Sequence, residues 1–146
     1  MSRPPDGLQI QLTATAESVY TRCSEEADQC ISNGDARNPK VKFFRTLDDA
    51  LSNGIPSDPF NQKIALSGSL SSIFRFSQDN LRVCYLGHGE QRRIIVLYIC
   101  QSSAEENESY ARFTYMVMSG KFDAAFASLG LRLPDRQGLL PNPRVN

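Results

Sequence analysis

Two arginines in the middle of the chain, Arg75 and Arg82, have the residue type and spacing to act together on an anion. They flank Asp79-Asn80, a pair typical of a two-residue turn between antiparallel strands. With that turn, Arg75 pairs with Cys84 and lies on the same sheet face as Arg82. A guanidinium stays charged and binds phosphate oxygens in pairs. We therefore expect a small basic patch that stays partly wet, because two adjacent guanidinium groups cannot be buried unpaired.

Other basic residues are candidates for the rim of this patch. They are Lys63, His88, Arg92 and Arg93, and we expect all but His88 to contact a polyanion. His88 titrates in a range that suits an acid or a base. It also lies in a Gly-His-Gly turn, where an exposed loop histidine without a role is the alternative.

The composition sets limits on the function. The formal net charge is zero, so any nucleic-acid surface has to be local. The four cysteines show no C-x-x-C spacing and there is one histidine, so we expect reduced thiols, no metal site and no cofactor. No apolar run is long enough to cross a membrane, and Met1–Gly7 has no apolar signal core, so we expect a cytoplasmic protein.

Two helices are expected between the first strand and the hairpin. Leu8–Leu12 alternates apolar and polar residues, which indicates a half-buried strand. Thr15 or Ser18 can cap the first helix, which Asn33-Gly34 ends through a left-handed residue. Asn38-Pro39 starts the second helix, and Asn53-Gly54 is expected to end it in the same way.

After a loop over residues 55–69, the pattern predicts three strands, at 70–77, 81–86 and 93–100. The last is apolar on both faces, as in a covered central strand. Phe74, Phe76, Val83 and Val96 should be buried, with the aromatic side of the hairpin against the two helices. Helices follow at 105–118 and 122–129. We predict one α+β domain over residues 1–132, with its core at 8–101, and an extended tail over 133–146.

Four sequence segments in this order resemble the RelE/ParE toxin superfamily of bacterial type II toxin–antitoxin systems. They are Leu66-Ser67-Gly68, Arg75, Arg82-Val83-Cys84-Tyr85 and the apolar strand Ile94–Ile99. The resemblance covers about two thirds of the chain. It implies a strand-helix-helix-strand-strand-strand fold with a twisted antiparallel sheet packed on a helical hairpin. It also implies a cognate antitoxin as partner.

The resemblance further implies messenger RNA cleavage, usually in the ribosomal decoding site, which would inhibit translation. In this reaction the phosphate is transferred to the neighbouring 2′-hydroxyl. It needs a base for that hydroxyl, positive charge to stabilise the transition state and an acid for the leaving oxygen. Arg82 is the first candidate for the positive charge and Arg75 the second. Tyr110 is a candidate for stacking on a base or assisting proton transfer, and Glu105 for the general base.

Each of these residues also has a structural alternative. Arg75 and Arg82 would otherwise be solvated strand arginines or salt-bridge partners of an antitoxin, and Tyr110 would pack a helix on the sheet. The acidic segment Glu105–Glu108 would repel RNA if it lay near the patch. This segment favours two other functions: a DNA gyrase-binding poison, or a catalytically inactive relative that binds an antitoxin.

Overall fold

The computed structural model describes residues 7–102 and 106–134. Its secondary structure runs in the order strand, two helices, a series of short helical turns, three strands and two helices. The elements are β1 (Gln9–Leu12), α1 (Ala14–Ser32), α2 (Pro39–Asp49), the turns η2 (Ala50–Gly54), α3 (Ile55–Ser57), η3 (Gln62–Ile64) and η4 (Gly68–Leu70), β2 (Ile73–Gln78), β3 (Leu81–His88), β4 (Arg93–Gln101), α4 (Glu106–Met118) and α5 (Asp123–Ser128). The expected α+β class and strand-helix-helix-strand-strand-strand order are confirmed.

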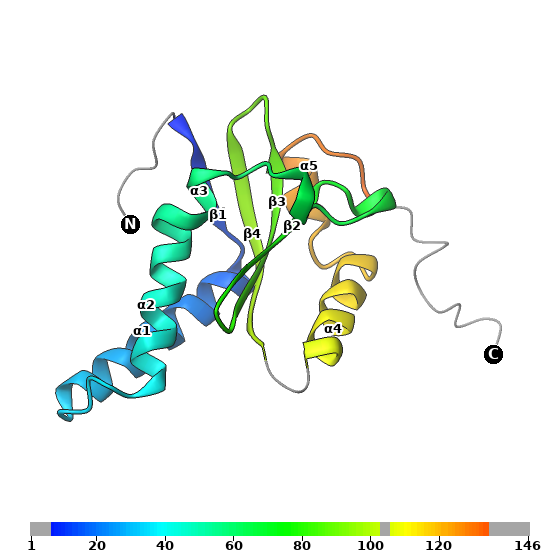
Figure 1. The fold of residues 1–146 in the computed structure, drawn as a ribbon. Helices are drawn as coiled ribbons and strands as arrows, with labels where there is room; N and C mark the ends of the chain where they lie inside the picture. Colours follow the sequence, from blue (N-terminus) through cyan, green and yellow to red (C-terminus); the bar gives the residue numbers. More distant parts are fainter. Residues whose placement is uncertain (1–6, 103–105, 135–146) are drawn as a thin grey trace, which may run out of the picture.

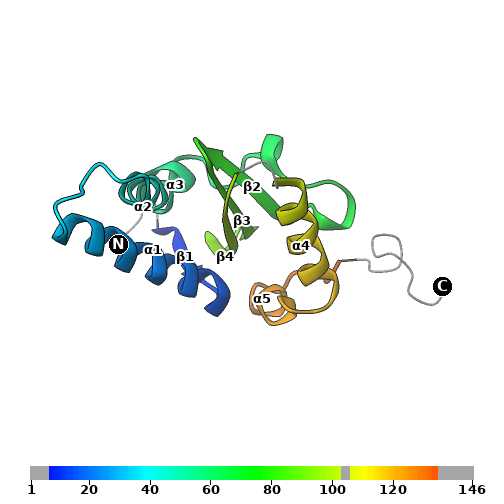
Figure 2. The same ribbon diagram turned by 90° about the horizontal axis from the view of Figure 1, so that it is seen from below.

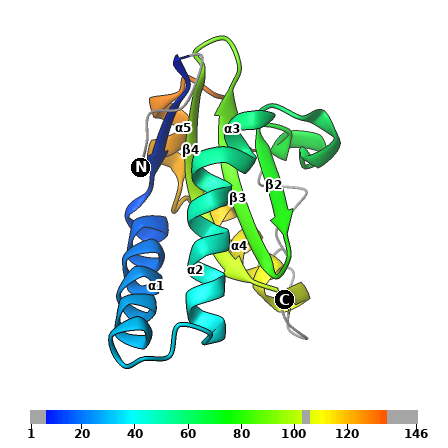
Figure 3. The same cartoon turned by 60° about the vertical axis from the view of Figure 1, so that its left-hand side comes forward.

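The four strands form one sheet in the order β1-β4-β3-β2. β2, β3 and β4 form an antiparallel meander, as expected, whereas β1 runs parallel to β4, so the sheet as a whole is mixed. The helical hairpin α1–α2 covers one face of the sheet, and α4 with α5 covers the other (Figures 1 and 2). Figure 3 shows the strands side by side behind α2. β4 is therefore an inner strand covered on both faces, as its apolar sequence predicts.

The hairpin between β2 and β3 has the register that the turn residues predict. Ser77 pairs with Arg82 and Arg75 with Cys84. Asp79 has φ 51°, the left-handed conformation that a two-residue hairpin turn requires. This register places Arg75 and Arg82 on the same face of the sheet.

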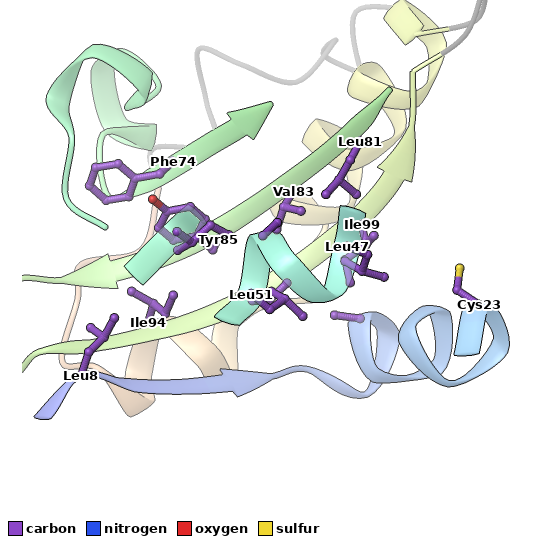
Figure 4. Packing of buried hydrophobic residues seen from close by; sticks show 14 residues of the cluster. Leu8, Cys23, Leu47, Leu51, Phe74, Leu81, Val83, Tyr85, Ile94 and Ile99 are labelled. Carbon is purple, nitrogen blue, oxygen red and sulfur yellow. The ribbon is translucent and has the colours of Figure 1, made fainter. Parts of the chain in front are cut away.

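Two hydrophobic clusters hold the layers together. The first lies between the sheet and α1–α2, where the Tyr85 ring stacks on Phe74 with 5.3 Å between centroids (Figure 4). The second lies between the sheet and α4–α5, around Leu97 and Phe113. Three of the expected core residues, Phe74, Val83 and Val96, are buried.

Phe76 was also expected to be buried, but its side chain is only partly buried. It lies on β2, which is an edge strand, so one flank of its ring has no neighbouring strand to cover it. The aromatic side of the hairpin nevertheless packs toward α1–α2, as expected.

The helix ends confirm two expectations and correct two. α1 ends at Asn33 with Gly34 at φ 78°, and Asn38 caps α2 before Pro39, both as expected. The cap of α1, however, is Thr13 rather than Thr15 or Ser18. Its hydroxyl accepts a hydrogen bond from the Ala16 amide at 3.1 Å, so the helix starts directly after β1.

Asn53-Gly54 does not end the second helix. Gly54 has φ −62°, and the chain continues helically through η2 into α3. A Cβ at Gly54 would lie 2.9 Å from Cζ of Phe76, so the glycine permits close approach of the two segments rather than a left-handed turn. The predicted loop 55–69 thus contains α3, η3 and part of η4.

The remaining boundaries differ by a few residues. β2 begins at Ile73 because the preceding residues form η4, and β3 extends to His88, so that residue belongs to a strand rather than a turn. Gly120, at φ 91°, separates α4 from α5, in the gap between the two predicted helices. None of the described helices has the length and apolarity to cross a membrane. The predicted tail lies mostly outside the described residues, and the domain limits stay predictions.

Candidate functional site

Three predicted site residues come together on the sheet face that α4 covers. Arg75 from β2, Arg82 from β3 and Tyr110 from α4 form what we call the arginine cluster. They line a cavity of about 10 Å³. The remaining lining residues are Cys84, Tyr98, Cys100 and Phe113.

Arg75 is half-buried and lies against an aromatic ring. Its guanidinium carbon is 5.0 Å from the centroid of Tyr110, the geometry of a cation–π contact. Cys84 lies opposite it on β3. The Tyr110 ring therefore packs against one side of the Arg75 guanidinium.

Arg82 is also half-buried and closes the hairpin turn. Its NH1 donates hydrogen bonds to the carbonyl oxygens of Asp79, at 2.9 Å, and Leu81, at 2.8 Å. These two bonds hold the guanidinium at the β2–β3 end of the sheet.

Arg112 is a third arginine at this site, and the sequence analysis missed it. It lies on α4, near enough to Tyr98, which lines the cavity, for its charge to act on the Tyr98 hydroxyl. Burial raises the pKa of Tyr98, and the positive charge of Arg112 opposes that effect. The sequence offered one signal for Arg112, which is that it lies two residues after Tyr110. That spacing does not show which face of the sheet the helix covers, so it could not place Arg112 near the cavity.

Cys84, one of the two cysteines at the cavity, is poorly suited to act as a nucleophile. Burial raises the pKa of the Cys84 thiol to about 12, so it stays protonated at neutral pH. Cys100 is the cross-strand partner of Arg82 and is half-buried. Among the described residues, no group of three histidine, cysteine or acidic side chains could hold a metal ion.

Three expected rim residues lie at the other end of the sheet. His88 pairs with Arg93, whereas Arg82 pairs with Cys100. Arg82 and His88 lie six positions apart on β3, about 20 Å at the rise of a strand. The expectation that His88, Arg92 and Arg93 border the arginine patch is wrong, because the register of β3 and β4 places them at the opposite end of the sheet.

These residues have local structural contacts instead. Arg93 donates to the Ser128 carbonyl at 3.2 Å and to Gln11 Oε1 at 3.0 Å, and so ties β4 to β1 and to the end of α5. The guanidinium of Arg92 lies 5.7 Å from the centroid of Phe60. His88 Nδ1 accepts a hydrogen bond from the backbone N–H of Gln91 at 3.3 Å.

Two candidates remain, Lys63 and Glu105. Lys63 is exposed on η3 and is not one of the residues that line the cavity. Glu105 lies outside the described residues. The arrangement can hold an anionic group against arginine side chains, but its cavity is too small to enclose a nucleotide.

No protein-family model matches the sequence, and no curated protein matches it. Among solved structures, the chain is similar to one from the toxin–antitoxin complex RelBE2 of Mycobacterium tuberculosis. The two chains are 13% identical, and the match covers 69% of this chain and 94% of that one, with a TM-score of 0.47. What the site does must therefore follow from its own residues.

Proposed function

We propose that this protein is a toxin of a type II toxin–antitoxin system, of the RelE/ParE kind, and that it cleaves messenger RNA. The observation that carries the proposal is the arginine cluster. Two guanidinium groups from neighbouring strands and a tyrosine from a distant helix share one face of the sheet. The element order that the sequence motifs imply, and that is observed, supports the same assignment.

The cluster suits the charge that develops during cleavage. Attack of a 2′-hydroxyl on the adjacent phosphate passes through a transition state with extra negative charge on the phosphate oxygens. A fixed guanidinium stabilises that charge without having to reorganise. We assign this role to Arg82, which its turn contacts hold in place, with Arg75 as a second cation.

Tyr110 acts as a positioning residue in this proposal. Its ring lies against the Arg75 guanidinium, which fixes the direction of that charge. RNA approaches the outer rim of the cluster, because the cavity of about 10 Å³ admits no nucleotide. Glu105 remains the proposed general base.

The proposed partner is an antitoxin that covers the arginine face or wraps the helices. A disordered antitoxin segment that folds on binding would cover the exposed parts of the cluster and exclude RNA. Antitoxin binding would then weaken when Arg75 and Arg82 are both replaced, if masking of these residues is part of inhibition.

Induction of the protein in growing cells tests the proposal. The parent protein should arrest growth and create new 5′ ends in messages, mapped by primer extension, and Arg82→Ala should do neither. Arg45→Ala is the matched control, because Arg45 is an exposed arginine on α2, against the other face of the sheet. Cleavage by Arg82→Ala at the parent level would refute the site assignment.

A catalytically inactive antitoxin-binding relative is the second candidate. The narrow cavity favours it, as do the contacts that Arg82 already makes with backbone carbonyls. If this protein is such a relative, it would form a complex with its antitoxin. Neither the parent nor Arg82→Ala would then cut messages, with or without ribosomes.

A further inference from the structure

The pairing of β3 with β4 contains an irregularity next to the arginine cluster. Tyr85 pairs with Val96, and the preceding residue Cys84 pairs with Tyr98, so Leu97 is an extra residue in β4 that has no partner on β3. This arrangement is a β-bulge, and a bulge changes the direction of the side chains beside it. Bulges are frequent next to active sites, where they re-aim a side chain.

The bulge moves Tyr98 to the face of the sheet that α4 covers. Alternate residues of a regular strand share a face, so Tyr98 would otherwise lie with Ile94 and Val96 against α1–α2. Instead it packs with Leu97 in the cluster on the α4–α5 side, and it lines the cavity of the arginine cluster. The extra residue therefore brings to the site a tyrosine that strict alternation along the strand would place on the opposite face.

The register of the strands places Tyr98 beside both arginines. Arg75, Cys84 and Tyr98 form one row across β2, β3 and β4. The small side chain of Cys84 leaves room above it for the two longer side chains to approach each other. Arg82 precedes Cys84 by two residues, so it is a diagonal neighbour of Tyr98, at a separation that aromatic and long side chains can bridge.

The Tyr98 ring is held in place but is not fully covered. It packs against Phe113 of α4, with 5.4 Å between the ring centroids. Leu97 and Ile99 are buried on either side of it, whereas Tyr98 is only half-buried. Burial raises the pKa of Tyr98, so the hydroxyl keeps its proton at neutral pH. A fixed, protonated and partly accessible hydroxyl is suited to donate a proton.

We propose that Tyr98 is the general acid of the cleavage reaction and donates its hydroxyl proton to the leaving 5′-oxygen. The inference rests on the proposed function. As the 2′-oxygen bonds to phosphorus and gives its proton to the general base, the bond from phosphorus to the 5′-oxygen breaks. The Tyr98 proton completes the new 5′-hydroxyl, and a proton that returns through water restores the tyrosine and the base. Arg75 and Arg82 cannot take this role, because a guanidinium does not give up its proton in proteins.

A leaving group that needs no proton tests this role. Single-turnover cleavage is measured on a ribosome-bound message and on the same message with sulfur in place of the 5′-oxygen at the mapped cut site. A thiolate leaves without protonation, because thiols are far more acidic than alcohols. Tyr98→Phe should cut the oxygen message roughly a hundred-fold more slowly than the parent, the lower end of the usual contribution of a general acid. It should cut the sulfur message at the parent rate.

The matched control is Tyr115→Phe. It also removes one hydroxyl from a tyrosine of the site's surroundings, but Tyr115 on α4 is 64% exposed and does not line the cavity. This variant should cut both messages as the parent does. The urea midpoint of Tyr98→Phe should equal that of the parent, because the ring and its contact with Phe113 remain.

The outcomes separate this inference from the proposed function. If Tyr98→Phe cuts the oxygen message as fast as the parent, Tyr98 is not the acid, and the proposed function stands. Equal slowing on the oxygen and sulfur messages also refutes the inference, because the hydroxyl would then support structure or binding rather than protonation. If the parent cuts neither message, the proposed function fails and the inference fails with it.

Discussion

The contact between Arg75 and Tyr110 places an aromatic ring against a guanidinium group. The guanidinium carbon is 5.0 Å from the ring centroid, and the two residues come from elements that are distant in the sequence. The sequence motifs led to Arg75 and Arg82 as candidates, and the family resemblance led to Tyr110. They missed Arg112, because no spacing rule connects a helix to the side chains of the sheet that it covers.

Replacement of Tyr110 distinguishes a positioning role from proton transfer. Tyr110→Phe keeps the ring and should retain most of the parent's single-turnover rate of RNA cleavage. Tyr110→Ala should lower that rate roughly tenfold, since a partly buried cation–π contact is worth about 1–2 kcal/mol. If Tyr110→Phe were as slow as Tyr110→Ala, the hydroxyl and not the ring would be the active group.

At the scale of elements, aromatic rings packed over β3 explain why the strand has a glycine at position 87. Gly87 lies beneath two rings: an added Cβ would come within 3.0 Å of Phe74 and 3.1 Å of Phe60. Phe74 is buried and stacks on Tyr85, so it has little room to move. The glycine therefore permits the rings to cover the strand.

Gly87→Ala should reduce the free energy of unfolding by about 1–3 kcal/mol, the usual cost of overpacking a core. The measurement is urea unfolding of the parent and the variant. Gly89→Ala is the matched control, because its added Cβ would make only ordinary contacts with Phe60 at 3.9 Å. Equal stability of the two variants would show that the aromatic rings can move aside.

Sequence patterns placed the elements more reliably than their ends. Turn chemistry set the β2–β3 register, because Asp79-Asn80 allows few alternatives. Asn53-Gly54 resembled a helix end, but packing of Phe76 against Gly54 overrode that local signal. The rim residues His88 and Arg93 were misplaced because their position depends on the lengths of β3 and β4.

At the scale of the whole molecule, burial of ionisable groups on both sides of the sheet makes the fold sensitive to alkali. Burial raises the pKa of Cys84 from 9.0 to about 12, and it also raises the pKa of Tyr85, whose hydroxyl donates to the Pro59 carbonyl at 2.7 Å. Burial likewise raises the pKa of Tyr20 and Cys23.

These shifts predict that the protein loses stability as the pH rises above about 9. The Cys84 thiol ionises more easily in the unfolded chain than in the folded protein. Its contribution to the free energy of unfolding is therefore intact below pH 9.0 and is lost as the pH approaches 12. Urea unfolding at a series of alkaline pH values measures the fall. Cys84→Ala should make it shallower, and a flat profile in the parent would contradict the assigned burial.

The central claim is that the arginine cluster drives attack of a 2′-hydroxyl on RNA. Its most direct test is single-turnover cleavage of a ribosome-bound message and of the same message with one deoxynucleotide at the mapped cut site. The parent should cut only the all-ribose message, leaving a 2′,3′-cyclic phosphate. Arg82→Ala should be about a hundred-fold slower, as when an oxyanion donor is removed, with partial recovery in Arg82→Lys. Cleavage of the deoxy-substituted message, or an unchanged rate in Arg82→Ala, would contradict the claim.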